Sequence, residues 1–172
     1  MDYYQKTIYI PKVDKNDTIL GKIERWEAHK NGILHRGFTA VLRYQDKIIV
    51  QHRKHPVFDG FYDVSFSSHQ TYDGDRLLSP TEVIVSTLKR EWIWKTEFNV
   101  TPEFIGKFYY REKDPKSEYF EHEINHMYQI DINEIPEFNP EFAYGMEAVD
   151  KSMLKAKNGL YAPWVVGIFK LL

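Results

Sequence analysis

Three histidines and two glutamates are the side chains of this sequence whose types could form one metal site. They come from separate segments, at His29 and His35, at His69, and at Glu121 and Glu123. Because the chain has no cysteine, a transition-metal site must use histidine nitrogen and carboxylate oxygen. A single histidine is more often packed or exposed than a ligand, and the chain has seven. The residue types alone therefore leave open both a shared metal site and unrelated histidines.

The two glutamates stand in a strand-like segment with one residue between them. Side chains alternate along a strand, so Glu121 and Glu123 share one face. Two carboxylates on one face repel each other unless a cation or a proton joins them. They could form an ordinary solvated face, but the apolar neighbours Phe120, Ile124 and Met127 favour partial burial and hence a metal.

The composition indicates one soluble globular domain over residues 1–172. Hydrophobic residues make up 42% and charged residues 28%, and aromatic residues reach 16%, typical of a sheet core or of a cage for an apolar or cationic group. The net charge of -2 gives no basic stripe for nucleic acid and no polybasic patch for a membrane. The N-terminus lacks a signal-peptide core, and the apolar run 161–172 is too short to span a bilayer. We expect a cytoplasmic protein without nucleic-acid or membrane partners; its oligomeric state is left open.

Strand-like segments dominate the chain and must position these side chains. The alternation predicts a hairpin of Gly37–Arg43 and Lys47–Gln51 across Tyr44-Gln45-Asp46. Further strands are expected at Thr7–Val13, Ile19–Trp26, Phe61–Phe66, Glu103–Arg111 and Tyr119–Ile130.

One long helix is expected in the middle of the chain. Ser79 is the N-cap, Pro80 the first helical residue and Glu82 the third, which makes a capping box. We expect this helix to run to about Phe98. Two later helices are expected, near Glu147–Lys157, ending at Asn158-Gly159, and after Pro163.

In their order and spacing, several short motifs resemble type 1 isopentenyl-diphosphate isomerase, a branch of the Nudix superfamily. The resemblance spans about residues 21–164. The matching motifs are Glu27-Ala28-His29, Leu34-His35-Arg36, Ser67-Ser68-His69, Phe108-Tyr109-Tyr110-Arg111, Asp114-Pro115, Glu121-His122-Glu123 and Tyr161-Ala162-Pro163-Trp164. The resemblance implies an α+β Nudix fold, a mixed β-sheet sandwiched between helices (α/β/α).

The resemblance also implies roles for the site residues. His29, His35, His69, Glu121 and Glu123 would hold one divalent metal, with zinc, manganese and magnesium left open. Glu123 would also transfer a proton with help from Tyr110, and Trp164 would face the carbocation, as indole is the best cation–π partner. Arg25 and Arg53 would lie near the diphosphate of a small-molecule substrate. A second magnesium ion would be shared by that diphosphate and a helix glutamate, with Glu91 and Glu97 left open.

Two departures from the family pattern bear on activity. Ser67 stands where the family has a catalytic cysteine, and a hydroxyl is a far weaker acid than a thiol. The Nudix helix motif is also degenerate. One alignment fits Glu82, Arg90 and Glu91 but puts the metal-binding glutamate pair on Trp94 and Lys95. A second, which we prefer, matches Glu97-Phe98-Asn99-Val100 to the end of the motif and makes Glu97 the helix carboxylate.

Three functions remain open at this stage. The first is a metal-dependent isomerase that converts isopentenyl to dimethylallyl diphosphate, with catalytic residues Glu123, Ser67, Tyr110 and Trp164. The second is a Nudix hydrolase that cleaves a nucleoside or isoprenoid diphosphate; Tyr62-Asp63-Val64-Ser65 fits that group, although Ser68 replaces the glycine expected before His69. The third is a catalytically impaired module that still binds a diphosphate.

Overall fold

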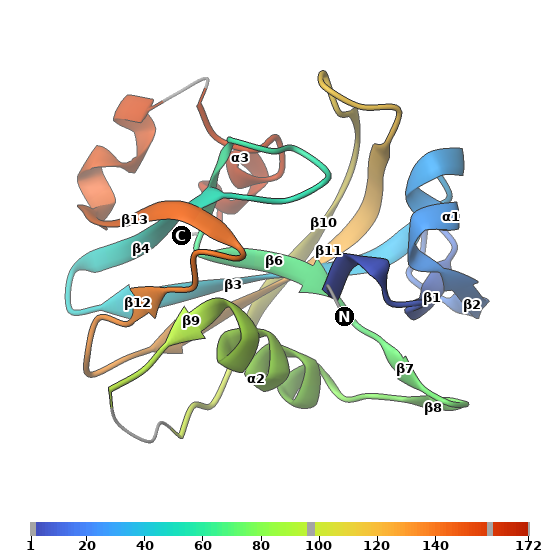
Figure 1. The fold of residues 1–172 in the computed structure, drawn as a ribbon, viewed down its shortest axis with the longest axis horizontal. Coiled ribbons are helices and arrows are strands. Elements are labelled where there is room, and N and C mark those ends of the chain that lie inside the picture. The colour runs from blue at the N-terminus through green and yellow to red at the C-terminus, as the bar shows by residue number, and fades with distance from the viewer. Residues whose placement is uncertain (1–2, 96–98, 158–159, 172) are drawn as a thin grey trace.

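The fold is α+β and is dominated by a mixed sheet (Figure 1). The computed structural model describes residues 3–95, 99–157 and 160–171. The main sheet comprises β1 (Tyr9–Val13), β2 (Ile19–Glu24), β3 (His35–Tyr44), β4 (Lys47–Arg53), β5 (Tyr62–Val64), β6 (Phe66–His69), β10 (Glu103–Lys113), β11 (Phe120–Asp131) and β13 (Ala143–Asp150). Two small sheets pair β7 (Tyr72–Asp73) with β8 (Arg76–Leu77) and β9 (Trp92–Ile93) with β12 (Glu137–Phe138). The helical segments are η1 (Tyr3–Gln5), α1 (Arg25–Asn31), α2 (Pro80–Glu91), η2 (Lys151–Lys157) and α3 (Val165–Ile168).

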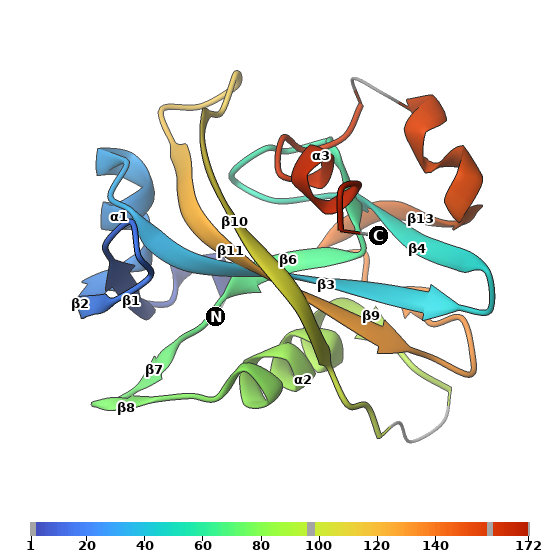
Figure 2. The same ribbon diagram turned by 180° about the vertical axis from the view of Figure 1, so that it is seen from behind.

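Strands β3 and β11 form the centre of the sheet and run parallel. Their alternating side chains supply two separate apolar cores, one on each face. Phe38, Ala40 and Leu42 of β3 pack with apolar residues of α2. Val41, on the opposite face, packs in a cluster with Trp164 that includes α3 residues. Figures 1 and 2 accordingly place α2 and α3 on opposite sides of the sheet.

Helix α2 begins as the sequence predicts but ends earlier. The Ser79 side chain accepts from the Glu82 N–H, and the Glu82 carboxylate accepts from the Ser79 N–H, so the capping box is confirmed. The expected continuation to Phe98 is wrong, because the helix stops at Glu91. Trp92 is extended and buried, and it pairs with Phe138 in the β9–β12 sheet. Glu97, our preferred helix carboxylate, lies outside the described residues.

Three other expected elements need correction. The strand expected at Ile19–Trp26 ends at Glu24, where helix α1 begins. The helix expected at Glu147–Lys157 is instead the end of β13, which pairs with β4, followed by the 3-10 helix η2. The strand expected at Phe61–Phe66 is divided into β5 and β6 at Ser65. The remaining strands and the short helix after Pro163 are confirmed.

Local contacts explain why α1 interrupts the strand pattern. The Glu24 carboxylate accepts a hydrogen bond from the Glu27 N–H at 2.9 Å and so caps the first turn. Gly32 ends the helix in the left-handed conformation, with φ 58°. Helix α1 therefore carries His29, and strand β3 begins shortly after the helix, at His35.

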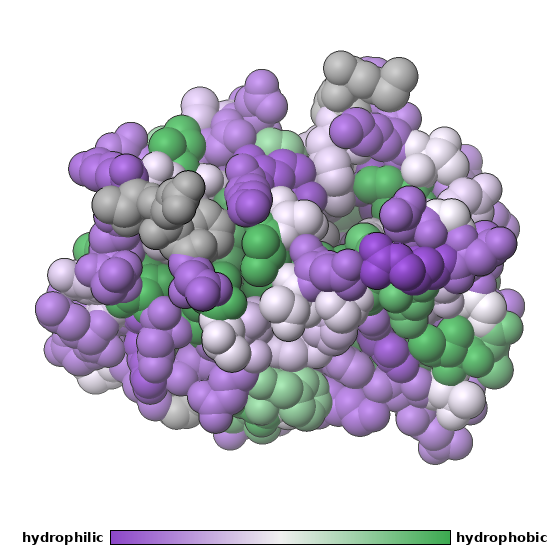
Figure 3. Space-filling model, turned by 90° about the horizontal axis from the view of Figure 1, so that it is seen from below, coloured by the Kyte–Doolittle hydropathy of each residue, from purple (hydrophilic) through white to green (hydrophobic). Residues whose placement is uncertain are grey.

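The surface seen from below in Figure 3 is largely hydrophilic, with separate smaller patches of hydrophobic residues. Among the residues that the structure describes, no helix is both long enough and apolar enough to cross a membrane.

Candidate active site

Histidines from three different elements meet two glutamates of β11. His29 lies on α1, His35 at the start of β3 and His69 at the end of β6. Ligand atoms of these histidines and Glu121 all lie within 4.8 Å of one another. The Nε2 atom of His29 is 3.4 Å from Glu121 Oε2, and that of His69 is 3.1 Å from Glu123 Oε1. The structure thus brings together the five side chains that the sequence suggested.

The hydrogen bonds around this cluster leave its inner nitrogen atoms unpaired. The Nδ1 atoms of His29 and His35 each lie 2.7 Å from a backbone carbonyl oxygen, so Nδ1 donates and Nε2 is the nitrogen left for the cluster. Burial would lower the pKa of His29, but Glu121 beside it raises that pKa above its usual value, so a metal would bind His29 with loss of a proton. Within the described part of the chain, Nε2 of all three histidines and Oε2 of Glu121 are buried without a hydrogen-bond partner. Burial lowers the pKa of His69 to about 4, so its ring is neutral at neutral pH. Such orphaned atoms fit a divalent metal, which needs neutral imidazole and ionised carboxylate.

Glu123 uses its two oxygen atoms differently. Oε1 faces His69 and His35, while Oε2 accepts from the Tyr110 hydroxyl at 2.7 Å and from the Asn125 amide at 3.1 Å. Burial would raise the pKa of Glu123, but the histidines beside it hold that pKa well below its usual range. Burial and the neighbouring carboxylates raise the pKa of Tyr110 well above its usual value. Tyr110 is therefore a hydrogen-bond donor that fixes an ionised Glu123.

Gly37 makes room for the Glu123 carboxylate. In the parallel pairing of β3 and β11, Gly37 lies opposite Asn125, two positions beyond the His35 and Glu123 pair. A Cβ atom on Gly37 would lie only 2.2 Å from Glu123 Oε1, so any other residue would displace the carboxylate. Sequence reasoning missed both Gly37 and Asn125, although a glycine inside a strand is a known sign of close approach.

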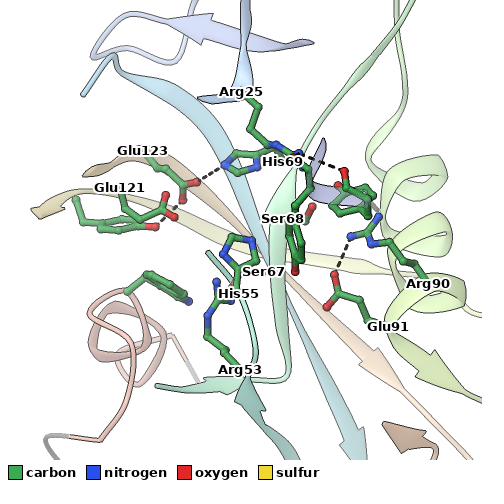
Figure 4. Close-up of a pocket in the computed structure, with 14 residues that line it drawn as sticks. Arg25, Arg53, His55, Ser67, Ser68, His69, Arg90, Glu91, Glu121 and Glu123 are labelled. Carbon is green, nitrogen blue, oxygen red and sulfur yellow. Dashed lines mark hydrogen bonds and ion pairs between the residues drawn. The ribbon is translucent and has the colours of Figure 1, made fainter. Parts of the chain in front are cut away.

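A cleft opens beside the histidines (Figure 4). Figure 4 shows Glu121 and Glu123 on one side of it, Arg90 and Glu91 on the other, and Ser67 between them. The predicted site residues that line the cleft are Arg25, Arg53, Ser67, His69, Tyr110, Glu121, Glu123 and Trp164. Tyr3, Tyr4, His55 and Arg90 also line it, and sequence reasoning gave them no place there. Glu91, one of the two helix glutamates considered for a second ion, lines it as well.

Ser67 lies on β6, directly opposite Thr39 of β3. Their hydroxyl oxygens are 2.7 Å apart, and either hydroxyl could be the donor. Thr39 is fully buried, whereas Ser67 reaches the cleft. Ser67 can therefore accept the hydrogen bond from Thr39 and direct its own hydroxyl group elsewhere. Alternatively, Ser67 donates the hydrogen bond to Thr39.

The Trp164 indole is held from two sides. Its Nε1–H donates to Asp63 at 3.0 Å, and the Arg53 guanidinium lies over its ring, 4.9 Å from the centroid. Arg53 also pairs with Asp63 at 2.9 Å. This buried network orients the aromatic wall of the cleft and places a positive charge beside it.

Three arginines, Arg25, Arg53 and Arg90, line the cleft and are incompletely paired. Arg90 donates to Glu91 at 2.7 Å and stacks on the Tyr3 ring, with its Cζ atom 3.9 Å from the centroid. Arg25 donates weakly to the backbone carbonyls of Tyr3 and Tyr4 at 3.4 Å. The Nε atoms of Arg25, Arg53 and Arg90 are buried and have no partner among the described residues. The missing partners and the three charges suit an anion.

One comparison with known proteins covers most of the sequence. The chain is 30% identical over 133 residues to isopentenyl-diphosphate Delta-isomerase 1 of Photorhabdus laumondii. The match includes 74% of this chain and 71% of that enzyme. A scan against protein-family models gives no match.

Solved structures share the fold at low sequence identity. DR0079 from Deinococcus radiodurans aligns with a TM-score of 0.68 at 18% identity, over 94% of this chain and 97% of that one. The MutT protein of Methanosarcina mazei gives 0.60 at 10% identity, over 80% and 91% of the two chains. The Nudix hydrolase RenU of M. smegmatis gives 0.52 at 11% identity, over 94% and 89%. Fold and sequence together show that the chain belongs to the type 1 isopentenyl-diphosphate isomerase family of the Nudix superfamily.

Proposed function

We propose that the protein is a metal-dependent isomerase that moves the double bond of isopentenyl diphosphate to give dimethylallyl diphosphate. The observation that supports this most directly is that Glu123, Ser67 and Trp164 line one cleft beside the histidine cluster. A reaction through a carbocation requires one group that donates a proton, a second group that removes one, and an aromatic wall that stabilises the cation. The sequence relative from Photorhabdus laumondii is named for the same reaction.

The histidine cluster would hold the divalent metal. The cluster supplies three imidazole nitrogens and two carboxylates, from His29, His35, His69, Glu121 and Glu123. This donor set suits zinc or manganese, and it also admits magnesium, which prefers the harder carboxylate oxygens. When bound, the ion supplies a fixed positive charge that orients the carboxylates and stabilises negative charge nearby.

The proton steps fall to the protein's own side chains. Because the site holds Glu123 ionised, the carboxylate must first take up a proton from solvent; hydrogen-bonded by the Tyr110 hydroxyl, it then gives that proton to the terminal carbon of the double bond, and a tertiary carbocation forms beside Trp164. A proton then leaves the neighbouring CH₂ group on the side of Ser67, and the new double bond forms there. The Ser67 oxygen accepts that proton poorly, although a hydrogen bond donated by Ser67 to Thr39 would leave the Ser67 lone pairs available. We therefore expect slow turnover.

The diphosphate would bind at the arginine side of the cleft. Arg25, Arg53 and Arg90 each have a buried Nε–H without a partner in the described structure, and charge-assisted hydrogen bonds to phosphate are strong. Glu91, at the end of α2, replaces Glu97 as the helix carboxylate that we assign to a second magnesium ion. It lines the cleft and is 7% exposed.

A second candidate is a Nudix hydrolase, and Glu91 is the observation that favours it. A helix carboxylate across the cleft from the histidine cluster could help to bind a metal-activated water that attacks a diphosphate. Against it, the residues that follow Glu91 are Trp92, Ile93 and Trp94, so no second glutamate extends the helix.

The test is conversion of isopentenyl diphosphate by the wild type, Ser67→Cys and Glu123→Gln, each loaded with metal. We expect slow conversion by the wild type, an increase of roughly 10²-fold in Ser67→Cys, and loss in Glu123→Gln, as for general acid–base groups. The control is Ser152→Cys, which adds a thiol at an exposed position of η2 and so tests whether any added sulfur has the same effect.

Two results would reject the isomerase, and a third would exclude a role for Ser67. Phosphate release from nucleoside diphosphate derivatives without isomerisation would identify the hydrolase. Tight diphosphate binding with no conversion by the wild type or Ser67→Cys would identify an impaired binding module. An equal gain in Ser152→Cys would remove Ser67 from the mechanism.

A further inference from the structure

His55 is a histidine of the cleft that has no part in the proton steps described above. It lies in the loop between β4 and β5 and lines the same cleft as Glu123 and Ser67 (Figure 4). It does not belong to the histidine cluster, so its ring stays available when that cluster binds an ion. Among the described residues its Nε2 atom has no hydrogen-bond partner, because the ring contacts the backbone through Nδ1.

The contacts of the His55 ring suit a general base. Its Nδ1 atom lies 3.0 Å from both the N–H and the carbonyl oxygen of Val57. In the tautomer with the proton on Nδ1, Nδ1–H donates to this carbonyl and Nε2 holds a free lone pair. The same hydrogen bond stabilises the imidazolium that forms when Nε2 takes up a proton. The edge-on contact with the Tyr4 ring, at a centroid distance of 4.9 Å, further fixes the ring.

The charge state of His55 also fits a general base. Burial lowers the pKa of His55 well below its usual value, and the nearby charge of Arg53 acts in the same direction. The ring is therefore neutral at neutral pH. A neutral imidazole is a far stronger base than the Ser67 hydroxyl group. The CH₂ group next to a carbocation is so acidic that even a base with a low pKa can remove its proton.

We propose that His55 removes the proton from the CH₂ group in the second step of the isomerisation. This inference rests on the proposed function and supplies the proton acceptor that Ser67 makes poorly. The C–H bond breaks, its electron pair forms the new double bond to the cationic carbon, and the proton moves to Nε2 of His55. His55 then releases this proton to solvent, while Glu123 takes up the next one. The slow turnover expected of the wild type thus depends on His55.

Incubation of the metal-loaded His55→Gln variant with isopentenyl diphosphate in D₂O tests the inference. Glu123 still forms the carbocation in this variant, but the cation can only return by losing a proton from the carbon that was protonated. Conversion to dimethylallyl diphosphate should fall by roughly 10²-fold or more, the contribution of a general base, while deuterium still enters the terminal carbon of isopentenyl diphosphate. The matched control is His52→Gln. The His52 ring stacks on Tyr62 at a centroid distance of 4.8 Å and does not line the cleft, so neither readout should change.

A double variant separates the chemistry of His55 from its effect on folding. The thiol of Ser67→Cys takes over the proton transfer, so Ser67→Cys combined with His55→Gln should keep most of the activity of Ser67→Cys alone. If the double variant is inactive, or if His55→Gln also stops deuterium entry, the role of His55 is structural and the inference is wrong.

Two further outcomes separate the inference from the proposed function. Conversion by His55→Gln at the wild-type rate, or by Ser67→Cys but not by the wild type, would overturn the inference alone. If neither the wild type nor Ser67→Cys converts isopentenyl diphosphate or exchanges its protons, the proposed function fails and the inference fails with it.

Discussion

At the scale of single residues, Gly37 controls the position of the Glu123 carboxylate. A methyl group in Gly37→Ala would overlap the Glu123 carboxylate, because the added Cβ would lie 2.2 Å from Oε1. The carboxylate must then move away from His35 and His69. We expect metal affinity to fall by roughly 10–100-fold, as when a partner that orients a ligand is lost. Metal titration followed by protein melting measures this change.

Gly145→Ala is the matched control for Gly37→Ala. Gly145 also lies within a strand, β13, but a Cβ there would meet no atom within 4 Å in the described structure. Metal affinity should be unchanged in this variant. Equal affinities in Gly37→Ala and the wild type would show that Glu123 does not contact the metal.

The sequence reveals the chemical types in the site better than their surroundings. His29, His35, His69, Glu121 and Glu123 could be singled out because their types can bind a metal and because the motifs that carry them resemble those of the isomerase family. The position of Arg90 in the cleft could not be predicted, because its guanidinium packs against Tyr3, which is distant in the sequence. Asn125 looked like an ordinary strand residue until the β3–β11 register placed its amide on Glu123.

At the scale of elements, hydrogen bonds of Asp17 connect the turn between β1 and β2 to strands β3, β10 and β11. Its carboxylate is 6% exposed and accepts from Arg36 at 2.8 Å, Lys107 at 2.9 Å and His126 at 2.7 Å. The residue has φ 68°, a left-handed conformation that asparagine also tolerates. Asp17→Asn should therefore add no backbone strain. It should lower the free energy of unfolding by about 1–3 kcal/mol at pH 7, because the charged hydrogen bonds are lost. Chemical denaturation measures it, and the exposed Asp75→Asn should have a far smaller effect.

The effect of Asp17 depends on pH in a defined direction. Partial burial would raise the pKa of Asp17, but hydrogen bonds from Lys107, His126 and Arg36 lower it below its usual value. A carboxyl with a lowered pKa stabilises the folded state above its unfolded pKa of about 3.9 and loses this contribution as pH falls through the folded value. The wild type and Asp17→Asn should thus converge in stability under acidic conditions. A constant difference from pH 7 to acid would contradict this explanation.

Elements with regular alternation could be predicted, and elements set by local capping or distant pairing could not. The segments now seen as β3, β10 and β11 alternate over many residues, and the Ser79 capping box marked the start of α2. Helix α1 was missed because its cap is Glu24, an uncommon capping residue, within a segment that alternates like a strand. The end of α2 depends on Trp92 pairing with Phe138, which no local pattern reveals.

At the scale of the whole molecule, the histidine cluster connects elements that are far apart in the chain. Helix α1 and strands β3, β6 and β11 each contribute a donor, from His29 to Glu123. Apart from the β3 pairings with β6 and β11, these elements have no shared hydrogen-bond ladder among the described strands. A metal at their meeting point would add a cross-link between the first third of the fold and its later strands, so metal binding and folding stability should be coupled.

Removal of metal should therefore lower the melting temperature of the whole protein. A ligand at about 100 times its Kd stabilises the folded state by about 2.7 kcal/mol. For a chain of this size, that corresponds to roughly 5–10 °C in Tm. Melting with a chelator and then with added zinc, manganese or magnesium measures the shift and ranks the metals. His35→Gln should abolish the difference between chelated and metal-loaded protein. His122→Gln should retain it, because His122 alternates to the face opposite Glu121 and Glu123 and donates toward the Gly32 carbonyl at 2.7 Å. If chelated and loaded wild type melt at the same temperature with every metal, the five side chains form a buried polar network rather than a metal site.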